Sequence, residues 1–450
     1  MTCSRARMLA LLCATATMAF ATNATAQTNT EIFQNFQWNF STPGARANGM
    51  GRAFIGLADD ATAAVANPAG LRNLTKPQVY VEYKNTNLRN PRLAGQNSIL
   101  TGATTNFGDD VNMLSFFSVG APIGKRVTVS FTRHEFLNYQ ESFDFGPRNE
   151  TDQATAGVGF FPVHANSDFT AASYAGTIAA TVAKNLRVGV TIAANRLSAK
   201  SDLLRTNCTP ASCAGAAIDN GVPVNEAVIA DQSASAASAT VGVLYNVNDM
   251  IAVGATYASG PAFKLSEDFV GFVNGNPSSF CKSGAVQPCP DPLFPQNLTL
   301  HVPSRFGAGF SVRPQDRLLA TFDVVHVMYS DLMKDFIVTT NLTTLQPSNF
   351  TVRDVTEVHL GGEYNLLTGM HPVYVRGGLF TNPDHPLTFV PSSNLSAHLI
   401  SSQNDSFNAL PVQTKVFGTV GVGVVLQQRF QIDAAYVGSK EFVLSAAARF

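Results

Sequence analysis

Polar and apolar residues alternate with a period of two along most of this chain. The segment Val355 to Leu366 shows the pattern clearly. Its polar face carries Glu357, His359 and Glu363, and its apolar face carries Val358, Leu360, Tyr364 and Leu366. Alternation of this kind predicts β-strands with one wet and one apolar face. Strands that face lipid on one side and a polar interior on the other have this pattern.

Fourteen such strands are expected, joined alternately by short turns and long connections. The strands outside the hairpin units are Pro77 to Asn87, Val111 to Pro122, Val127 to Phe136, Val355 to Leu366, Val373 to Phe380, Lys415 to Leu426, Phe430 to Val437 and Lys440 to Phe450. Paired strands are expected within 172–197, 235–263 and 302–329. The predicted fold class is therefore all-β, a transmembrane antiparallel barrel of about 14 strands, with both chain ends on the periplasmic side.

The long connections fit the outer face of such a barrel better than a compact soluble domain. They are Leu88 to Asp110, Leu137 to Thr170, Ser201 to Ala234, Lys264 to His301, Ser330 to Asp354 and Thr381 to Thr414.

The chain ends on an amphipathic strand with a terminal Phe450. Such an ending is similar to the signal that the barrel-assembly machinery recognises in its clients, although Ala448 stands where an aromatic residue is common. We therefore expect that machinery, outer-membrane lipid and lipopolysaccharide as partners.

The N-terminus predicts export. Arg5 and Arg7 precede an apolar run, and Ala24-Thr25-Ala26 suits signal peptidase, so residues 1–26 are expected to be a signal peptide. No later run reaches the roughly 18 apolar residues of a helical span. The expected location is the outer membrane of a Gram-negative bacterium.

Charge excludes a polyanion as partner. Charged residues make up 14% of the chain and the net charge is -1, which becomes -3 once Arg5 and Arg7 are removed. This balance indicates no nucleic-acid binding. Sequence motifs of hydrolases and nucleotide-binding enzymes are missing or incomplete, so we expect no enzyme activity and no cofactor.

One segment, Gly49 to Leu71, fits neither signal nor strand. It is small, rich in Gly and Ala, and precedes an apparently complete barrel. We interpret residues 27–76 as a plug, or hatch, folded inside the barrel formed by residues 77–450. Gly49 and Gly51 would allow close backbone approach in a narrow lumen, and Asn67 with Pro68 would make a rigid turn.

The same segment carries a family resemblance. Gly49-Met50-Gly51-Arg52-Ala53, Ala58-Asp59-Asp60-Ala61 and Asn67-Pro68-Ala69 resemble the N-terminal hatch of the FadL/TodX family, and Val302-Pro303-Ser304-Arg305 and Tyr329-Ser330-Asp331 extend the likeness. The resemblance implies capture of long-chain fatty acids or aromatic hydrocarbons by outer loops, passage through an apolar lumen, and lateral release between strands. Scaffold or shuttle barrels of a protein secretion system resemble the hatch too, and are the alternative function.

The candidate hatch or gate residues are Gly49, Gly51, Arg52, Asp59, Asp60, Asn67, Pro68 and Ala69. Arg52 could pair with Asp59 or Asp60, or with charged groups on the barrel wall. A cation site at Asp59 and Asp60 is the less favoured interpretation, because no further carboxylates cluster nearby. No metal is therefore predicted. The Asn67-Pro68-Ala69 turn is either a gate or a fixed hinge.

Two further sets of residues fall in expected outer loops. Cysteines outside the signal are expected to form the disulfides Cys208–Cys213 and Cys281–Cys289, with other pairings and a zinc site left open. Aromatic residues that could capture a hydrophobe are Phe263, Phe269, Phe272, Phe280 and Phe294. Packing of the loops against each other, or against lipopolysaccharide, is the alternative for these phenylalanines.

Overall fold

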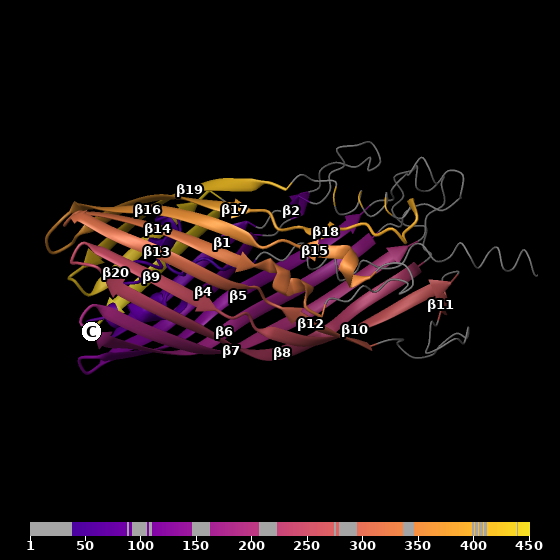
Figure 1. Ribbon diagram of the computed structural model, residues 1–450, viewed down its shortest axis with the longest axis horizontal. Helices are drawn as coiled ribbons and strands as arrows, with labels where there is room; N and C mark the ends of the chain where they lie inside the picture. Colours follow the sequence, from indigo (N-terminus) through magenta and orange to yellow (C-terminus); the bar gives the residue numbers. More distant parts are fainter. Residues whose placement is uncertain are drawn as a thin grey trace, which may run out of the picture.

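The protein is a closed antiparallel β-barrel. The computed structural model describes residues 38–87, 90, 91, 106, 107, 110–145, 163–206, 223–273, 276–278, 295–335, 346–397, 400, 404, 408, 412–438 and 440–450. Each strand of the barrel pairs with its neighbours in chain order, and β1 closes the ring by pairing with both β21 and β4. Fourteen strands cross the barrel, as the alternation predicts (Figure 1).

The barrel strands are β1 (Gln78–Asn87), β4 (Asp110–Ile123), β5 (Val127–Phe145), β6 (Val163–Ala183), β7 (Leu186–Thr206), β8 (Pro223–Asn246), β9 (Ile251–Ala258) continued by β10 (Ala262–Val273), β12 (Pro295–His301) continued by β13 (Ser304–Gln315), β14 (Leu318–Met328), β16 (Val355–Leu367), β17 (Val373–Pro383), β19 (Thr414–Leu426), β20 (Phe430–Val437) and β21 (Glu441–Arg449).

Two adjacent barrel strands are interrupted at the same height. One consists of β9 and β10 with a break between them, and the other consists of β12 and β13 with a break between them. Pro261 and Pro303 lie in the two interruptions, and proline has no N–H for a ladder bond. Contacts across the break replace the ladder: Val302 N–H donates to Pro261 O over 2.9 Å, and Gly260 N–H donates to Ser304 Oγ over 3.2 Å. We call this line across the wall the crease.

An apolar belt surrounds the end of the barrel that carries the short turns. On β6 the outward side chains Tyr174, Ile178 and Val182 are 45%, 53% and 56% exposed. Further along β6, toward the long loops, His164, Asn166 and Asp168 are the exposed residues. A membrane-spanning strand needs only about 9–11 residues, whereas β6, β7 and β8 have 21, 21 and 24. These strands therefore continue well beyond the belt.

This extension corrects the predicted loop boundaries. The strands β5, β7 and β10 run on to Phe145, Thr206 and Val273, through residues that the alternation assigns to loops. Above the belt the outward face lies in water, so it no longer needs apolar residues, and the alternation ends while the hydrogen-bond ladder continues. Phe263, expected in a loop, lies in β10 and is fully buried.

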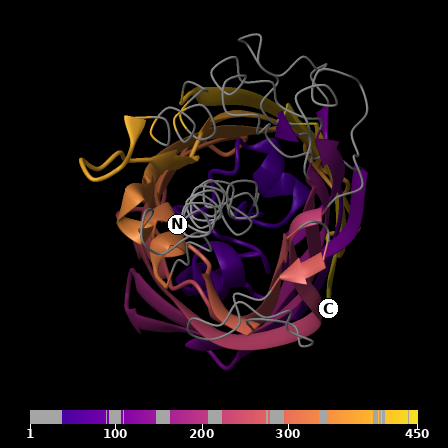
Figure 2. The same cartoon turned by 90° about the vertical axis from the view of Figure 1, so that its right-hand side faces the viewer.

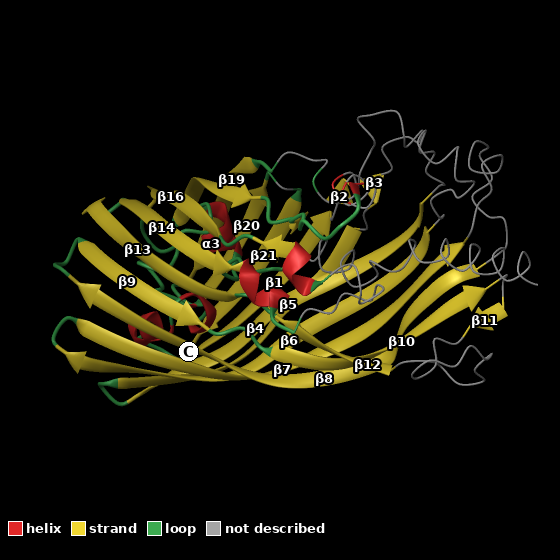
Figure 3. Ribbon diagram, turned by 45° about the vertical axis from the view of Figure 1, so that its right-hand side comes forward, coloured by secondary structure: helices red, strands yellow, loops and turns green. Residues whose placement is uncertain are grey.

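The segment before β1 lies within the ring of strands, as the end-on view shows (Figure 2). It contains α3 (Ala45–Gly49), α4 (Ala63–Ala66) and the 3₁₀ helix η1 (Pro68–Asn73). The helix α3 packs against β17, β19, β20 and β21, and η1 packs against β5 to β8 on the other side of the barrel (Figure 3). The segment thus contacts opposite walls.

Short elements cover the loop end of the barrel. They are β2 (Asn90–Pro91) paired with β3 (Asn106–Phe107), β11 (Asn276–Ser278) beside β10, η3 (Tyr329–Met333), η4 (Pro347–Asn349), and β15 (Phe350–Val352) paired with β18 (Leu387–Phe389). Within the described residues, no helix is long and apolar enough to span a bilayer.

Candidate functional site

The inner segment meets the barrel wall at glycines. A Cβ built on Gly378 would lie 2.5 Å from the carbonyl carbon of Met50, and one on Gly421 would lie 3.1 Å from Cα of Gly49. Gly51 has a φ of +63°, a conformation that favours glycine. Its N–H donates to Thr419 Oγ1 over 2.9 Å. Gly49 and Gly51 therefore have the close backbone contacts that the sequence predicts.

The Asn67-Pro68-Ala69 turn packs in the same way against the opposite wall. Asn67 Nδ2 donates to Ile55 O and to Val243 O, each over 3.0 Å, while its Oδ1 accepts from Ala69 N over 3.2 Å. On the wall, Gly242 lies against Asn67 and Gly189 against Pro68. All three turn residues are buried. The turn is therefore bonded both within the segment and to β8.

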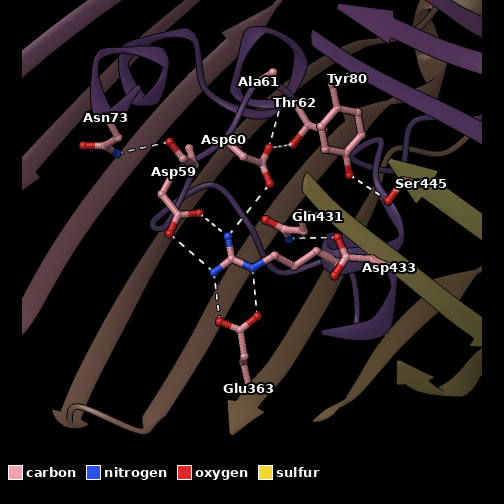
Figure 4. Close-up of polar contacts among 12 residues, drawn as sticks. Asp59, Asp60, Ala61, Thr62, Asn73, Tyr80, Glu363, Gln431, Asp433 and Ser445 are labelled. Carbon is pink, nitrogen blue, oxygen red and sulfur yellow. Dashed lines mark hydrogen bonds and ion pairs between the residues drawn. The ribbon is translucent and has the colours of Figure 1, made fainter. Parts of the chain in front are cut away.

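The two acids of the segment lie beside Arg46, a residue that the sequence did not single out. Figure 4 shows Asp59, Asp60 and Glu363 directed toward one guanidinium group. Arg46 Nη1 lies 2.5 Å from Asp59 Oδ1 and 3.9 Å from Asp60 Oδ2, and its Nε donates to Glu363 over 2.8 Å. Burial opposes the charge on Arg46, but Asp59 and Glu363 outweigh burial and raise its pKa well above the usual range. Burial also raises the pKa of Asp60, although Arg46 opposes this shift.

The wall extends the same charge network. Arg376 on β17 donates from Nε to Glu363 over 2.7 Å and from Nη1 to Asp433 over 2.8 Å. Arg376 and both carboxylates are nearly inaccessible. Asp59 and Asp60 thus face guanidinium groups, and no cluster of three or more metal-ligating side chains occurs among the described residues.

Arg52 contacts the wall and not the two acids. Its Nη2 lies 2.9 Å from Glu441 on β21, which also lies 2.9 Å from Lys84 Nζ of β1. The sequence left two alternatives open for Arg52, an acid of the inner segment or a charged group on the barrel wall. The structure shows the second.

Backbone donors of the segment are also bonded to the wall. Phe54 N–H and Ile55 N–H donate to Asp323 Oδ2 on β14 over 2.5 and 2.7 Å, and Gly44 N–H donates to Glu82 on β1. Asp323, Glu82 and Glu441 could have been singled out from the sequence, because each is an acid on the inward face of an amphipathic strand. Their partners were not predictable, because alternation reveals which face a residue lies on but not which part of the segment it meets.

Above the segment, toward the long loops, the inner surface becomes apolar. One cluster of buried side chains there draws on β5 to β8, β10, β12, β14 and the short covering elements. It comprises Trp38, Phe136, Leu137, Tyr139, Phe169, Ala171, Leu197, Ala199, Ile229, Ala234, Phe263, Leu265, Leu298, Leu300, Val302, Val327, Tyr329, Leu332, Phe350, Val352, Val355, Leu387, Phe389 and Leu395. We call it the upper apolar cluster.

The ladder between β4 and β5 is incomplete at this height. It runs from Ile123–Val127 to Phe116–His134 and stops there, although β5 continues to Phe145. Just beyond, a bulge in β5 turns both Phe136 and Leu137 inward. The start of the inner segment lies against this free edge, where Asn39 N–H donates to Phe136 O over 2.8 Å. We call this the β4–β5 gap.

Several predicted residues lie outside what can be described. Cys208, Cys213, Cys281, Cys289, Phe280 and Phe294 lie outside the described residues, and Phe269 and Phe272 are described for their backbone only. The expected signal peptide, residues 1–26, also lies outside them. Phe450 is described and is 71% exposed at the end of the barrel.

Solved structures share this architecture. A FadL homologue of Pseudomonas aeruginosa aligns with 92% of this chain and 100% of its own, with a TM-score of 0.56 and 14% identity. The Ralstonia pickettii toluene transporter TbuX gives a TM-score of 0.54 at 16% identity over 92% of this chain and 99% of its own. The P. putida toluene transporter TodX gives 0.55 at 14% identity over 91% and 99%. At these identities the likeness shows the fold alone.

Family membership rests on a separate comparison. Curated proteins give no significant match. The sequence profile described as "Outer membrane protein transport protein (OMPP1/FadL/TodX)" matches residues 36–379, which is more than half of the chain. The chain therefore belongs to the OMPP1/FadL/TodX family of outer membrane transport proteins.

Proposed function

We propose that this protein carries hydrophobic small molecules, long-chain fatty acids or aromatic hydrocarbons, passively across the outer membrane of a Gram-negative bacterium, without a catalytic step. The observation that carries the proposal is that apolar side chains gather in the outer part of the barrel, above an inner segment that is packed against opposite walls. A diffusion pore for hydrophilic solutes has a polar, open lumen. Here the upper apolar cluster is the apolar environment into which a hydrophobe would pass, and the inner segment blocks the direct path below it.

Hydrophobic transfer provides the driving force for entry. Burial stabilises a solute by about 0.8 kcal/mol per methylene, so a long alkyl chain would leave water readily for the upper apolar cluster. Outer loops are proposed to make the first contact with the cargo. Phe269, Phe272, Phe280 and Phe294 remain candidates for that step, whereas Phe263 belongs to the lumen wall.

The β4–β5 gap is the proposed route of release. It begins beside Leu114, an outward side chain of the belt that is 52% exposed, so it opens toward the lipid. Trp38, next to Asn39 at the gap, stacks on Phe136 with ring centroids 6.3 Å apart. Release by this route requires residues 38–40 to move, while the glycine contacts and ion pairs hold the rest of the segment in place.

Arg305 favours acids among the possible cargoes. Its guanidinium lies 4.2 Å from the ring of Phe40, and its Nη1 donates to Phe40 O over 3.3 Å. Among the described residues, no carboxylate lies within 4.0 Å of it. A carboxylate at the head of an apolar ligand would supply the missing partner of this cation.

Uptake measurements test the proposal. A deletion strain and the complemented strain would be given labelled oleate, toluene and a hydrophilic control solute. We expect the deletion to slow uptake of at least one hydrophobe and to leave the hydrophilic solute unchanged. Normal uptake of every hydrophobe, combined with accumulation of secreted proteins in the periplasm, would instead support the scaffold function.

A further inference from the structure

Cations gather at one side of the short-turn end of the barrel. Lys125 and Arg126 lie in the β4–β5 turn, Lys184 lies in the β6–β7 turn, Arg187 is the second residue of β7, and Arg72 lies in the last turn of η1. The contacts join these segments: Arg72 Nη2 donates to Lys125 O, and Thr181 N–H donates to Arg126 O over 2.9 Å. We call these five residues the basic patch.

The segments that carry the basic patch have no acidic side chain of their own. Residues 72–77, 121–128 and 180–188 contain no Asp or Glu. Asp59 of the inner segment is already paired with Arg46 and with Arg313, the latter over 3.1 Å.

The five cations differ in what they face. Lys125, Arg126 and Lys184 are exposed on the rim of the barrel. Arg72 belongs to the inner segment, and Arg187 shares a strand face with the buried Gly189 and donates to Asn246 Oδ1 over 3.1 Å. The three exposed side chains are therefore the ones that a ligand outside the lumen can reach.

The position of the basic patch points to the kind of anion. Ile123 and Val182, 58% and 56% exposed, are the last outward apolar side chains on the same two hairpins. The basic patch therefore begins where the apolar belt ends, at the height of the lipid headgroups. Short turns lie on the periplasmic side of outer-membrane barrels, and basic side chains next to a membrane surface bind its anionic lipids.

We propose that the basic patch binds the phosphate groups of anionic phospholipids in the periplasmic leaflet, with the alkyl chains lying along Ile123 and Val182. Each phosphate supplies acceptors for the exposed side chains of Lys125, Arg126 and Lys184. The lipid binds outside the lumen, so this site is independent of transport.

Native mass spectrometry of the detergent-solubilised full-length barrel tests the site. The protein would be titrated with an equimolar mixture of phosphatidylglycerol and phosphatidylcholine. We expect wild type to retain phosphatidylglycerol preferentially, and the triple variant Lys125→Gln/Arg126→Gln/Lys184→Gln to reduce that preference roughly tenfold or more, since each cation contributes separately. High salt should weaken the preference of wild type.

The matched control is the triple variant Arg196→Gln/Lys200→Gln/Lys264→Gln, which removes the same charge above the belt. It should keep the preference for phosphatidylglycerol. Heat-dependent gel mobility confirms that each variant is folded. An unchanged preference in the basic-patch variant, or an equal loss in the control, would overturn the proposal. So would photocrosslinking from position 125 in cells that captures an acidic protein and no lipid.

Discussion

At the scale of single residues, the interior of this barrel is held by charges that share partners. Arg376 bridges Glu363 and Asp433, and Glu363 in turn bonds Arg46 of the inner segment. A shared network of this kind leaves other groups uncompensated when one member is removed.

The substitution Arg376→Met should therefore destabilise the protein. Its loss leaves Asp433 buried with Gln431, at 2.8 Å, as its one side-chain donor among the described residues. Removing one partner of a buried ion pair costs about 3–5 kcal/mol, which urea unfolding of the refolded barrel would measure. The exposed Arg317, at the β13–β14 turn, is the control, and Arg317→Met should change the unfolding free energy by less than about 0.5 kcal/mol. Equal effects would contradict the assigned network.

Arg305→Met tests whether the lumen recognises a carboxylate. A hydrogen bond to a charged group is worth about 1.5–3 kcal/mol, so the dissociation constant of oleate should rise roughly tenfold or more. The dissociation constant of hexadecane should stay within about twofold, because an alkane has neither a charge nor a π face for the cation. Binding titrations with both ligands decide the matter. Equal weakening of both would show that Arg305 only supports Phe40.

At the scale of elements, the main relation is between the inner segment and its wall. The segment has little regular structure and draws its stability from backbone contacts at wall glycines. Neighbouring glycines on one strand differ sharply, since a Cβ on Gly378 would meet Met50 at 2.5 Å whereas one on Gly377 would meet nothing nearer than 3.9 Å.

Gly378→Ala should therefore displace the segment, and Gly377→Ala should not. We expect the first variant to make cells more permeable to a large hydrophilic antibiotic such as vancomycin, because the floor of the lumen no longer packs closely. The second variant serves as the matched control. Identical permeability of the two variants would count against a closing role for the segment.

The start of the segment is open to a direct optical test. Trp38 is the single tryptophan of the chain, is 9% exposed, and stacks on Phe40 with ring centroids 5.9 Å apart. Displacement of residues 38–40 by ligand should shift its emission to longer wavelength. Asn39→Pro, which removes the N–H bonded to Phe136, should cause part of the shift without ligand. Unchanged emission at saturating ligand would mean that the segment stays in place.

Sequence patterns predicted these elements unevenly. The inner segment was identifiable because Gly49, Gly51 and Asn67-Pro68 break the alternation, and their close contacts follow from backbone chemistry. The β4–β5 gap was not predictable, because Phe136 and Leu137 form a bulge without any Gly or Pro to indicate it. Arg46 gave no signal either, since a lone arginine has no pattern and its partner Glu363 lies 317 positions away.

At the scale of the whole molecule, the barrel divides into a part within the membrane and a part beyond it. The belt ends near Tyr174 on β6, and beyond Ala172 the outward residues of that strand are polar, as are Arg196 on β7 and Ser235 on β8. Alternation predicted the spanning part correctly, as Leu360 and Tyr364 outside and Glu363 inside illustrate. It failed above the belt, where strand pairing no longer depends on lipid.

Cysteine labelling in intact cells checks where the membrane ends. Lys200→Cys, on the exposed outer part of β7, should react with a membrane-impermeant maleimide. Ile192→Cys on the same strand, at a position 67% exposed to the lipid side, should not react. The parent protein sets the background from its own cysteines. Reaction at position 192 would place the membrane boundary lower than the belt indicates.

The crease bears on how proteins of this kind diversify. Across it, β9 and β10 keep one register with β13 and β12, since Ala258 pairs with Arg305 and Ala262 pairs with His301. Toward β8 the register changes by two residues, because Ala258 pairs with Thr240 below the crease and Asp268 pairs with Val228 above it. A longer or shorter β10–β12 hairpin would therefore change the outer chamber and leave the ladder between the spanning strands β9 and β13 as it is.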